Sequence, residues 1–218
     1  MSDTFDKLIP EATAFFIDLK ANNSRDWFQA NKPRYEAVVK KPARLLTQQI
    51  ATDLAKITGI PMSSKIFRVN RDIRFSKDKS PYNAHLHMLW IPDGHREGEV
   101  SAYFLGIAPD YVTTGAGRMG CDKAALDTYR NAVAGPDGAA LEDALAQARA
   151  AGARLDEPHL KRIPPGFDKD HARADLLRRK GLVIWFDAAK RAKAEGLIKT
   201  ALTDFDTSQP VTRWLDSI

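Results

Sequence analysis

The stretch RVNRDIRFSKDKSPY, residues 68–82, marks a change in the hydrophobic period of the chain. Apolar residues here alternate with polar ones at every second position, and only Arg71 interrupts the alternation. Because a β-strand turns successive side chains to opposite faces, the pattern predicts a strand over residues 65–76 with one apolar and one polar face. The apolar side chains that should face the helices are Val69, Ile73 and Phe75.

The polar side of this predicted strand and the turn after it carry groups that bind anions. Arginine offers a planar fork that holds phosphate or carboxylate at two points, and lysine and hydroxyl groups add single contacts. We therefore predict a site for a small anionic ligand, such as a phosphorylated one, in which Asp72 orients the arginines or acts as a catalytic base. The candidate ligand-binding residues are Arg68, Asn70, Arg71, Asp72, Arg74, Lys77, Lys79, Ser80 and Tyr82.

The same residues also allow a purely structural interpretation. Asp72 could bridge Arg68 or Arg74 along one face, and Asp78 could cap the turn that follows. In that case the polar strand would be an internal salt-bridge network in an interaction scaffold. The segment is not a nucleotide P-loop, because it contains no glycine and no GKS or GKT triplet.

Three segments carry an excess of basic residues, namely 25–44, 65–82 and 161–180. If they met on one surface they would attract a nucleic-acid backbone, and Trp27 could stack on a base or a sugar. A nucleic-acid-associated module is therefore the alternative function, although Trp27 also fits an ordinary core position. The basic residues that should then lie on one side are Arg34 or Lys41, Arg74, and Arg178 or Arg179.

Metal binding has little support in the sequence. His85 and His87 are two residues apart, so a strand would turn both imidazoles to one face, where Asp72 could join them. No third ligand is fixed by spacing, and we predict neither a metal nor a cofactor. Cys121 is the single cysteine, which excludes an intrachain disulfide and a zinc site built from several cysteines.

The bulk properties fit one domain over residues 1–218. Of these residues 44% are hydrophobic, enough for a substantial core, and no linker or shift in composition marks a boundary. There is no run of about 18 apolar residues that would predict a membrane span. The start of the chain also lacks the pattern of a secretion signal. We expect a cytosolic protein without a membrane partner.

The order of the predicted elements favours an α+β fold. Helical periodicity precedes residue 60 and returns after residue 122, and Pro42 should kink or divide the long helical pattern before residue 60. We predict an antiparallel sheet of about five strands, flanked by N-terminal and C-terminal helices. The predicted strands cover residues 65–76, 85–91, 100–108, 110–116 and 181–186. The predicted helix starts are Pro10, Ser24, Asp122 and Asp170.

Three segments of the chain carry a family resemblance. They read NNSRDWFQANKPRYEAVVKKP at residues 22–42, RVNRDIRFSKDKSPY at 68–82, and IPPGFDKDHARADLLRRKGL at 163–182. Over nearly its whole length the chain resembles the bacterial conserved-hypothetical family known as domain of unknown function 2461. In that family a lysine often follows the Pro-Tyr pair, whereas this chain has Asn83. The resemblance implies a fold and a prominent segment, and it implies no particular activity.

Overall fold

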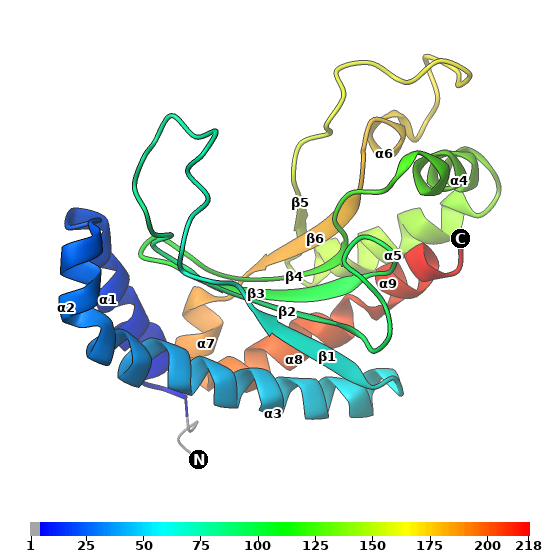
Figure 1. The fold of residues 1–218 in the computed structure, drawn as a ribbon. Helices are drawn as coiled ribbons and strands as arrows, with labels where there is room; N and C mark the ends of the chain where they lie inside the picture. The colour runs from blue at the N-terminus through cyan, green and yellow to red at the C-terminus, as the bar shows by residue number, and fades with distance from the viewer. Residues whose placement is uncertain (1–4) are drawn as a thin grey trace. The chain divides into compact units, whose positions relative to one another are not determined.

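The computed structural model describes residues 5–218, in which six strands form one sheet (Figure 1). The strand order is β1-β2-β3-β4-β6-β5, the sheet is antiparallel, and helices precede and follow its strands in the chain. The predicted α+β class is therefore confirmed. The strands are β1 (Met62–Ile66), β2 (Leu86–Pro92), β3 (Ala102–Ile107), β4 (Val112–Arg118), β5 (Arg154–Leu155) and β6 (Leu182–Asp187).

The helices fall into two groups along the chain. Those before the sheet are α1 (Leu8–Ala21), α2 (Arg25–Tyr35), a π-helical turn (Glu36–Lys40) and α3 (Lys41–Thr58). Those after β4 are α4 (Lys123–Ala134), α5 (Gly138–Ala150), α6 (Ala174–Leu177), α7 (Ala189–Glu195), α8 (Leu197–Thr207) and α9 (Gln209–Asp216). None of the helices in residues 5–218 has the length and apolar character that a membrane span needs.

The chain packs as two compact units. Unit 1 contains the residues up to Trp90 together with Phe104–Thr114 and Asp187–Thr203. Unit 2 contains Ile91–Tyr103, Gly115–Phe186 and Asp204–Ile218. The single domain expected over residues 1–218 remains a prediction.

Local sequence signals set the helix boundaries of unit 1. Ser24 is the N-cap of α2, and its Oγ accepts a hydrogen bond from the backbone N–H of Trp27 at 3.3 Å, as predicted. Pro42 lies in the first turn of α3, directly after the π-helical turn, so the predicted interruption at this proline is confirmed. Helix α3 ends at Gly59, whose φ of 75° is a left-handed conformation that favours glycine.

Aromatic side chains from the helices form much of the core of unit 1. Phe15, Phe28 and Tyr35 are buried, and the centroids of the Phe28 and Tyr35 rings are 5.3 Å apart. Helix α3 packs along β1 (Figure 1). The indole Nε1 of Trp90 donates a hydrogen bond to the Thr47 carbonyl oxygen at 2.9 Å, so this buried polar group is satisfied.

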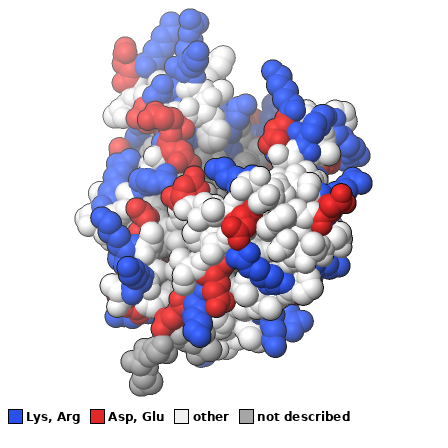
Figure 2. All heavy atoms as spheres, turned by 90° about the vertical axis from the view of Figure 1, so that its left-hand side faces the viewer, with Lys and Arg blue, Asp and Glu red and all other residues white. Residues whose placement is uncertain are grey.

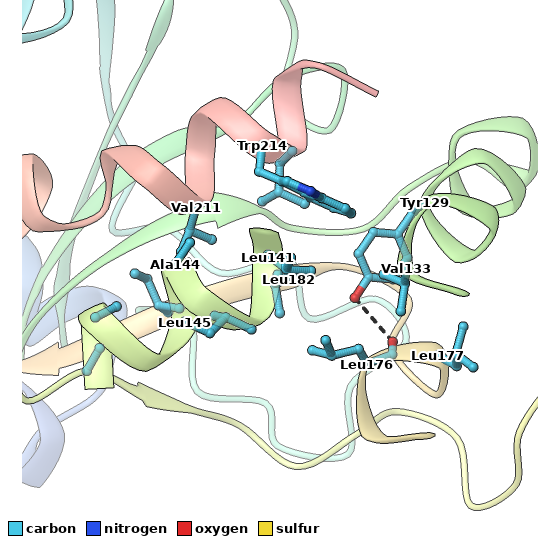
Figure 3. Close-up of a cluster of buried hydrophobic side chains, with 14 of the residues drawn as sticks. Tyr129, Val133, Leu141, Ala144, Leu145, Leu176, Leu177, Leu182, Val211 and Trp214 are labelled. Carbon is cyan, nitrogen blue, oxygen red and sulfur yellow. Dashed lines mark hydrogen bonds between the residues drawn. The ribbon is translucent and has the colours of Figure 1, made fainter. Parts of the chain in front are cut away.

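A separate cluster of buried apolar side chains forms the core of unit 2 (Figure 3). It combines residues of α4, α5, α6, β6 and α9. The Tyr129 hydroxyl donates to the Leu176 carbonyl oxygen at 3.2 Å, and Trp214 Nε1 donates to the Asp137 carbonyl oxygen at 2.8 Å. These bonds let large aromatic rings fill the core without leaving a polar atom unsatisfied.

The first predicted strand is largely wrong. Strand β1 ends at Ile66, and residues 67–85 form a long loop, the β1–β2 loop. Phe75 has 95% of its surface exposed, so it does not face the helices, whereas Val69 is buried as expected. The alternation is misleading because a strand needs a partner along its length, and here the only bridge inside the loop joins Asn70 to Tyr82.

The predicted helix starts in unit 2 have mixed outcomes. Asp122 caps α4, with its Oδ1 accepting from the Ala125 N–H at 2.8 Å, as predicted. The prediction for Asp170 is wrong, because α6 begins only after Arg173. The Asp170 N–H instead donates to Asp168 Oδ1 at 2.9 Å, so this segment forms a side-chain-stabilised turn before the helix.

Candidate functional site

Backbone hydrogen bonds hold the two sides of the β1–β2 loop together near its base. The Arg71 N–H donates to the Pro81 carbonyl oxygen at 2.9 Å, and the Asn83 N–H donates to the Val69 carbonyl oxygen at 2.7 Å. The loop projects away from the strands that it connects (Figure 1). Its base therefore has a defined geometry although the segment is not a regular strand.

Asn23, in the turn between α1 and α2, attaches this loop to the helices. Its Nδ2 donates to the Tyr82 carbonyl oxygen at 2.9 Å, and its Oδ1 accepts from the Tyr82 N–H at 3.1 Å. The buried Tyr82 ring stacks on Phe28, with centroids 4.1 Å apart and planes 22° apart. Tyr82, a predicted ligand-binding residue, therefore also anchors the loop.

A pocket of about 570 Å³, which we call the base pocket, opens where the loop meets the rest of unit 1. Its lining comes from the end of α1, the β1–β2 loop and the turn between β3 and β4. The polar side chains of the lining are Lys20, Asn23, Arg71, Asp78, Ser80, Tyr82, Asn83, His85, Asp110 and Tyr111.

A smaller hollow of about 270 Å³, which we call the loop pocket, lies on the β1–β2 loop. It is lined by the predicted site residues Arg68, Asn70, Arg71, Asp72 and Arg74. Three guanidinium groups face one carboxylate in this set, so the loop pocket has a positive balance. Arg71, the residue that interrupts the sequence alternation, lines both pockets.

Most charged side chains of the loop pair with one another. Asp72 accepts from Arg74 Nε at 3.0 Å and from Arg74 Nη2 at 2.7 Å. Asp78 accepts from Arg71 Nη1 and, at 2.9 Å, from the Ser80 N–H. These are the pairings that the structural interpretation of the sequence predicts for Asp72 and Asp78.

The pairings lower the pKa of both carboxyl groups. For Asp72 the main cause is the hydrogen bonding of the Arg74 side chain, and for Asp78 it is the backbone N–H of Ser80, followed by Arg71. A general base works best when its pKa lies near the operating pH. The catalytic role suggested for Asp72 by the sequence stays a prediction.

Two predicted site residues of the loop have no partner among residues 5–218. Arg68 and Lys77 are exposed and form no hydrogen bond or ion pair with that part of the chain. Lys79, in contrast, donates from Nζ to the Ile73 carbonyl oxygen at 3.0 Å. Arg68 is thus a guanidinium in the loop pocket that forms no hydrogen bond or ion pair with a described carboxylate, although its charge helps to lower the pKa of Asp72.

His85 and His87 stack at the start of β2, with ring centroids 3.7 Å apart and planes 15° apart. His87 Nε2 lies 2.6 Å from the Tyr111 hydroxyl oxygen. Burial lowers the pKa of His87 to about 4, and the neighbouring His85 adds to this effect. Because stacked rings direct their lone pairs along parallel planes, they do not converge on one ion. Residues 5–218 also contain no group of three side chains that could hold a metal.

Residues 11–214, which include the residues of both pockets, match the family model of conserved hypothetical proteins called DUF2461. The chain belongs to DUF2461. The match includes most of both units, and it confirms the family resemblance carried by the three sequence segments. No curated protein matches the chain.

The nucleic-acid features predicted for this DUF2461 protein come from both units. Trp27 does not line either pocket, and its half-buried ring lies 5.8 Å from the Phe15 ring, centroid to centroid. The basic segments 25–44 and 65–82 belong to unit 1, and the segment 161–180 belongs to unit 2. On the face shown in Figure 2, basic side chains are interspersed with acidic ones.

Sequence reasoning misses six polar residues of the base pocket as site residues, namely Lys20, Asn23, Asp78, Asn83, Asp110 and Tyr111. Pro109 and Asp110 form a recognisable turn signal between two predicted strands. Nothing in the sequence, however, links that turn to the β1–β2 loop. Their proximity follows from the order of strands in the sheet, which is a property of the folded chain.

Proposed function

We propose that this DUF2461 protein binds a small ligand with a phosphate or carboxylate group at the two pockets that share Arg71. The observation that carries the proposal is the position of Arg71 between the loop pocket and the base pocket. A ligand can then place its anionic group on the loop pocket and its remaining polar groups in the base pocket.

The loop pocket supplies the charge that such a group needs. Arg68 has no hydrogen-bond or ion-pair partner among the described residues. The second terminal nitrogen of Arg71, Nη2, donates a hydrogen bond to Ser76 Oγ at 3.0 Å. Guanidinium groups bind oxyanions at two points and remain charged at every physiological pH. The base pocket adds neutral hydrogen-bonding groups, including Ser80 and Tyr111.

The β1–β2 loop is already ordered at its base, so ligand binding should cost little conformational entropy there. The two hydrogen bonds of Asn23 and the stacking of Tyr82 on Phe28 already fix the base of the loop. A site held in place before binding loses less conformational entropy on binding. On the face shown in Figure 2, acidic side chains interrupt the basic ones, so this face lacks the continuous basic surface that a nucleic-acid backbone needs.

We also propose that the protein works in the cytosol of a bacterium. Its single cysteine, Cys121, fits a reducing compartment, and the family that it resembles is bacterial. The proposal includes no catalytic step.

Titration of ¹⁵N-labelled protein with inorganic phosphate tests the proposal through the amide signals of residues 68–74. We expect these signals to shift in a saturable way, and Arg68→Ala to weaken the interaction by about tenfold or more. Arg162→Ala is the matched control, because Arg162 is exposed and lines neither pocket. Equal phosphate affinity of the two variants at these signals would exclude the loop pocket as the site.

A further inference from the structure

An arginine of unit 2 is buried although its guanidinium group has no partner. Arg179 lies between α6 and β6, and only 6% of its surface is exposed. Its Nε is buried without a hydrogen-bond partner, and the guanidinium forms no hydrogen bond or ion pair with any residue from 5 to 218. The Arg179 N–H donates to the Leu176 carbonyl oxygen at 3.1 Å, so the main chain at this position is fixed.

The other buried arginines of unit 2 do have partners. Arg118 is also 6% exposed, and its Nη2 donates to the Leu215 carbonyl oxygen at 2.7 Å and to Asp216 Oδ1 at 3.1 Å. Arg130 is 9% exposed, and its Nε donates to the Leu177 carbonyl oxygen at 3.2 Å. The Nε of Arg118 is buried without a partner, like that of Arg179, but a terminal nitrogen of Arg118 is bonded, whereas no guanidinium nitrogen of Arg179 forms a hydrogen bond with the described residues.

The nearby carboxylates do not resolve this difference. Asp156 and Asp175 are close enough to act on Arg179 electrostatically. Asp175, however, accepts a hydrogen bond from Arg178 Nη2, and Asp156 accepts from Trp185 Nε1 at 2.8 Å. Both acids are therefore engaged by other groups.

Further cations surround the same turn. Arg154 Nη1 donates to Asp156 Oδ1 at 3.0 Å, and the charge of Arg149 acts on Arg179 directly. The N–H of Leu160 donates to the Arg178 carbonyl oxygen at 3.0 Å, which holds the chain around Lys161 against this turn. Among the groups whose charges act on Arg179, Tyr129, Asp175 and Asp156 are acidic and Arg149 is basic.

Burying a charge without a partner is unfavourable in free energy, and an arginine cannot reduce this cost by losing its proton. Burial lowers the pKa of Arg179, yet a guanidinium remains protonated in proteins, unlike a buried lysine, which can become neutral. A buried charge of this kind needs an anion that approaches it through its remaining exposed surface.

We propose that Arg179 is the anchor of a second anion site, in unit 2, that takes a phosphate or phosphoryl group. The planar fork of the guanidinium fits two oxygens of a tetrahedral oxyanion, and its permanent charge attracts a doubly charged phosphate more strongly than a singly charged carboxylate. The inference is independent of the proposed function, because Arg68 and Arg71 belong to unit 1 and Arg179 to unit 2.

The first test follows the Nε–H signal of Arg179 in protein labelled with ¹⁵N-arginine, assigned by comparison with Arg179→Lys. The titrant is inorganic phosphate in a buffer of low ionic strength, with acetate as the second titrant. The Arg68→Ala background removes the contribution of the loop pocket. We expect a saturable shift with phosphate and a much weaker one with acetate. An unchanged Arg179 signal, or equal affinity for acetate, would overturn the assignment to a phosphoryl group.

The second test compares the melting temperatures of variants with and without phosphate, all in the Arg68→Ala background, so that the loop pocket does not contribute. Arg179→Met should melt at or above the temperature of the Arg68→Ala protein in phosphate-free buffer, since it removes an unpaired buried charge, and it should lose the rise that phosphate causes. Arg179→Lys keeps the charge but not the fork, and should bind phosphate at least about tenfold more weakly. Lys190→Ala, an exposed change in unit 1, should behave as the Arg68→Ala protein does. A phosphate-dependent rise that persists in Arg179→Met and Arg179→Lys would contradict the proposal.

Discussion

The β1–β2 loop and the turn between α6 and β6 place arginine in opposite environments. In the loop, Arg74 has 76% of its side chain exposed and forms a two-point pair with Asp72. At the turn, Arg179 is buried and has no partner among residues 5–218. Stability alone would favour the reverse, because an exposed charge is solvated by water and a buried one is not. Arg74 therefore contributes to the conformation of the loop, whereas we assign Arg179 to ligand binding.

The largest effect is expected when a buried arginine with partners is removed. Arg118→Met leaves the Leu215 carbonyl oxygen without its 2.7 Å hydrogen bond and Asp216 without its ion pair. The free energy of unfolding should fall by about 2–4 kcal/mol, since a buried pair loses one member. Urea denaturation measures this change. Arg179→Met is the matched variant, and a similar loss in both would mean that the two buried arginines do not differ in role.

The next largest effect concerns the anchor of the β1–β2 loop. Asn23→Ala removes both hydrogen bonds to the Tyr82 backbone, and the free energy of unfolding should fall by about 1–3 kcal/mol. Hydrogen exchange at the Tyr82 amide should become faster. Asn22→Ala is the control, because the exposed Asn22 side chain bonds only to the Asp18 carbonyl oxygen, at 3.0 Å. Equal exchange rates in the two variants would show that the loop is held by other contacts.

Much of the fold follows from local signals in the sequence. The N-caps Ser24 and Asp122 and the apolar run of β6 are set by residues within a few positions of one another, and the structure has them where they are predicted. The β1–β2 loop has the same alternation as a strand but lacks a partner beyond the Asn70–Tyr82 bridge. Pairing between strands is not local, so alternation alone could not distinguish the two.

The candidate site is less accessible to sequence reasoning. The basic composition of the loop indicates a charged surface, yet it does not show that Asp72 engages Arg74 and leaves Arg68 without a partner. Arg179 belongs to a predicted basic segment, but burial is what distinguishes it from Arg178 and Lys180. Burial of one charged side chain depends on packing between distant segments, and no pattern in the sequence reports it.

A smaller effect is expected from the pH dependence of His87. Its folded-state pKa of about 4 lies below the usual value for histidine, so the unfolded chain binds the proton more tightly. The resulting stability is complete above pH of about 6.5 and is lost as the pH falls towards 4. Because the ring is partly exposed, we expect a loss of about 1–2 kcal/mol over this range. Urea denaturation at a series of pH values, with His87→Gln subtracted from wild type, measures it. A difference that does not depend on pH would contradict the buried neutral state.

The smallest effect on stability is expected for Arg74→Ala. The side chain is largely exposed, and its pair with Asp72 is screened by water and salt, so the urea midpoint should stay within experimental error of wild type. Phosphate affinity at the signals of residues 68–74 should nevertheless fall, because Asp72 then faces the loop pocket without its partner. Arg68→Ala, which removes an unpaired guanidinium, should reduce that affinity further. A large loss of stability in Arg74→Ala with an unchanged response to phosphate would mean that the loop arginines form a structural salt-bridge network. Arg179, in unit 2, would then be the one arginine still assigned to a ligand.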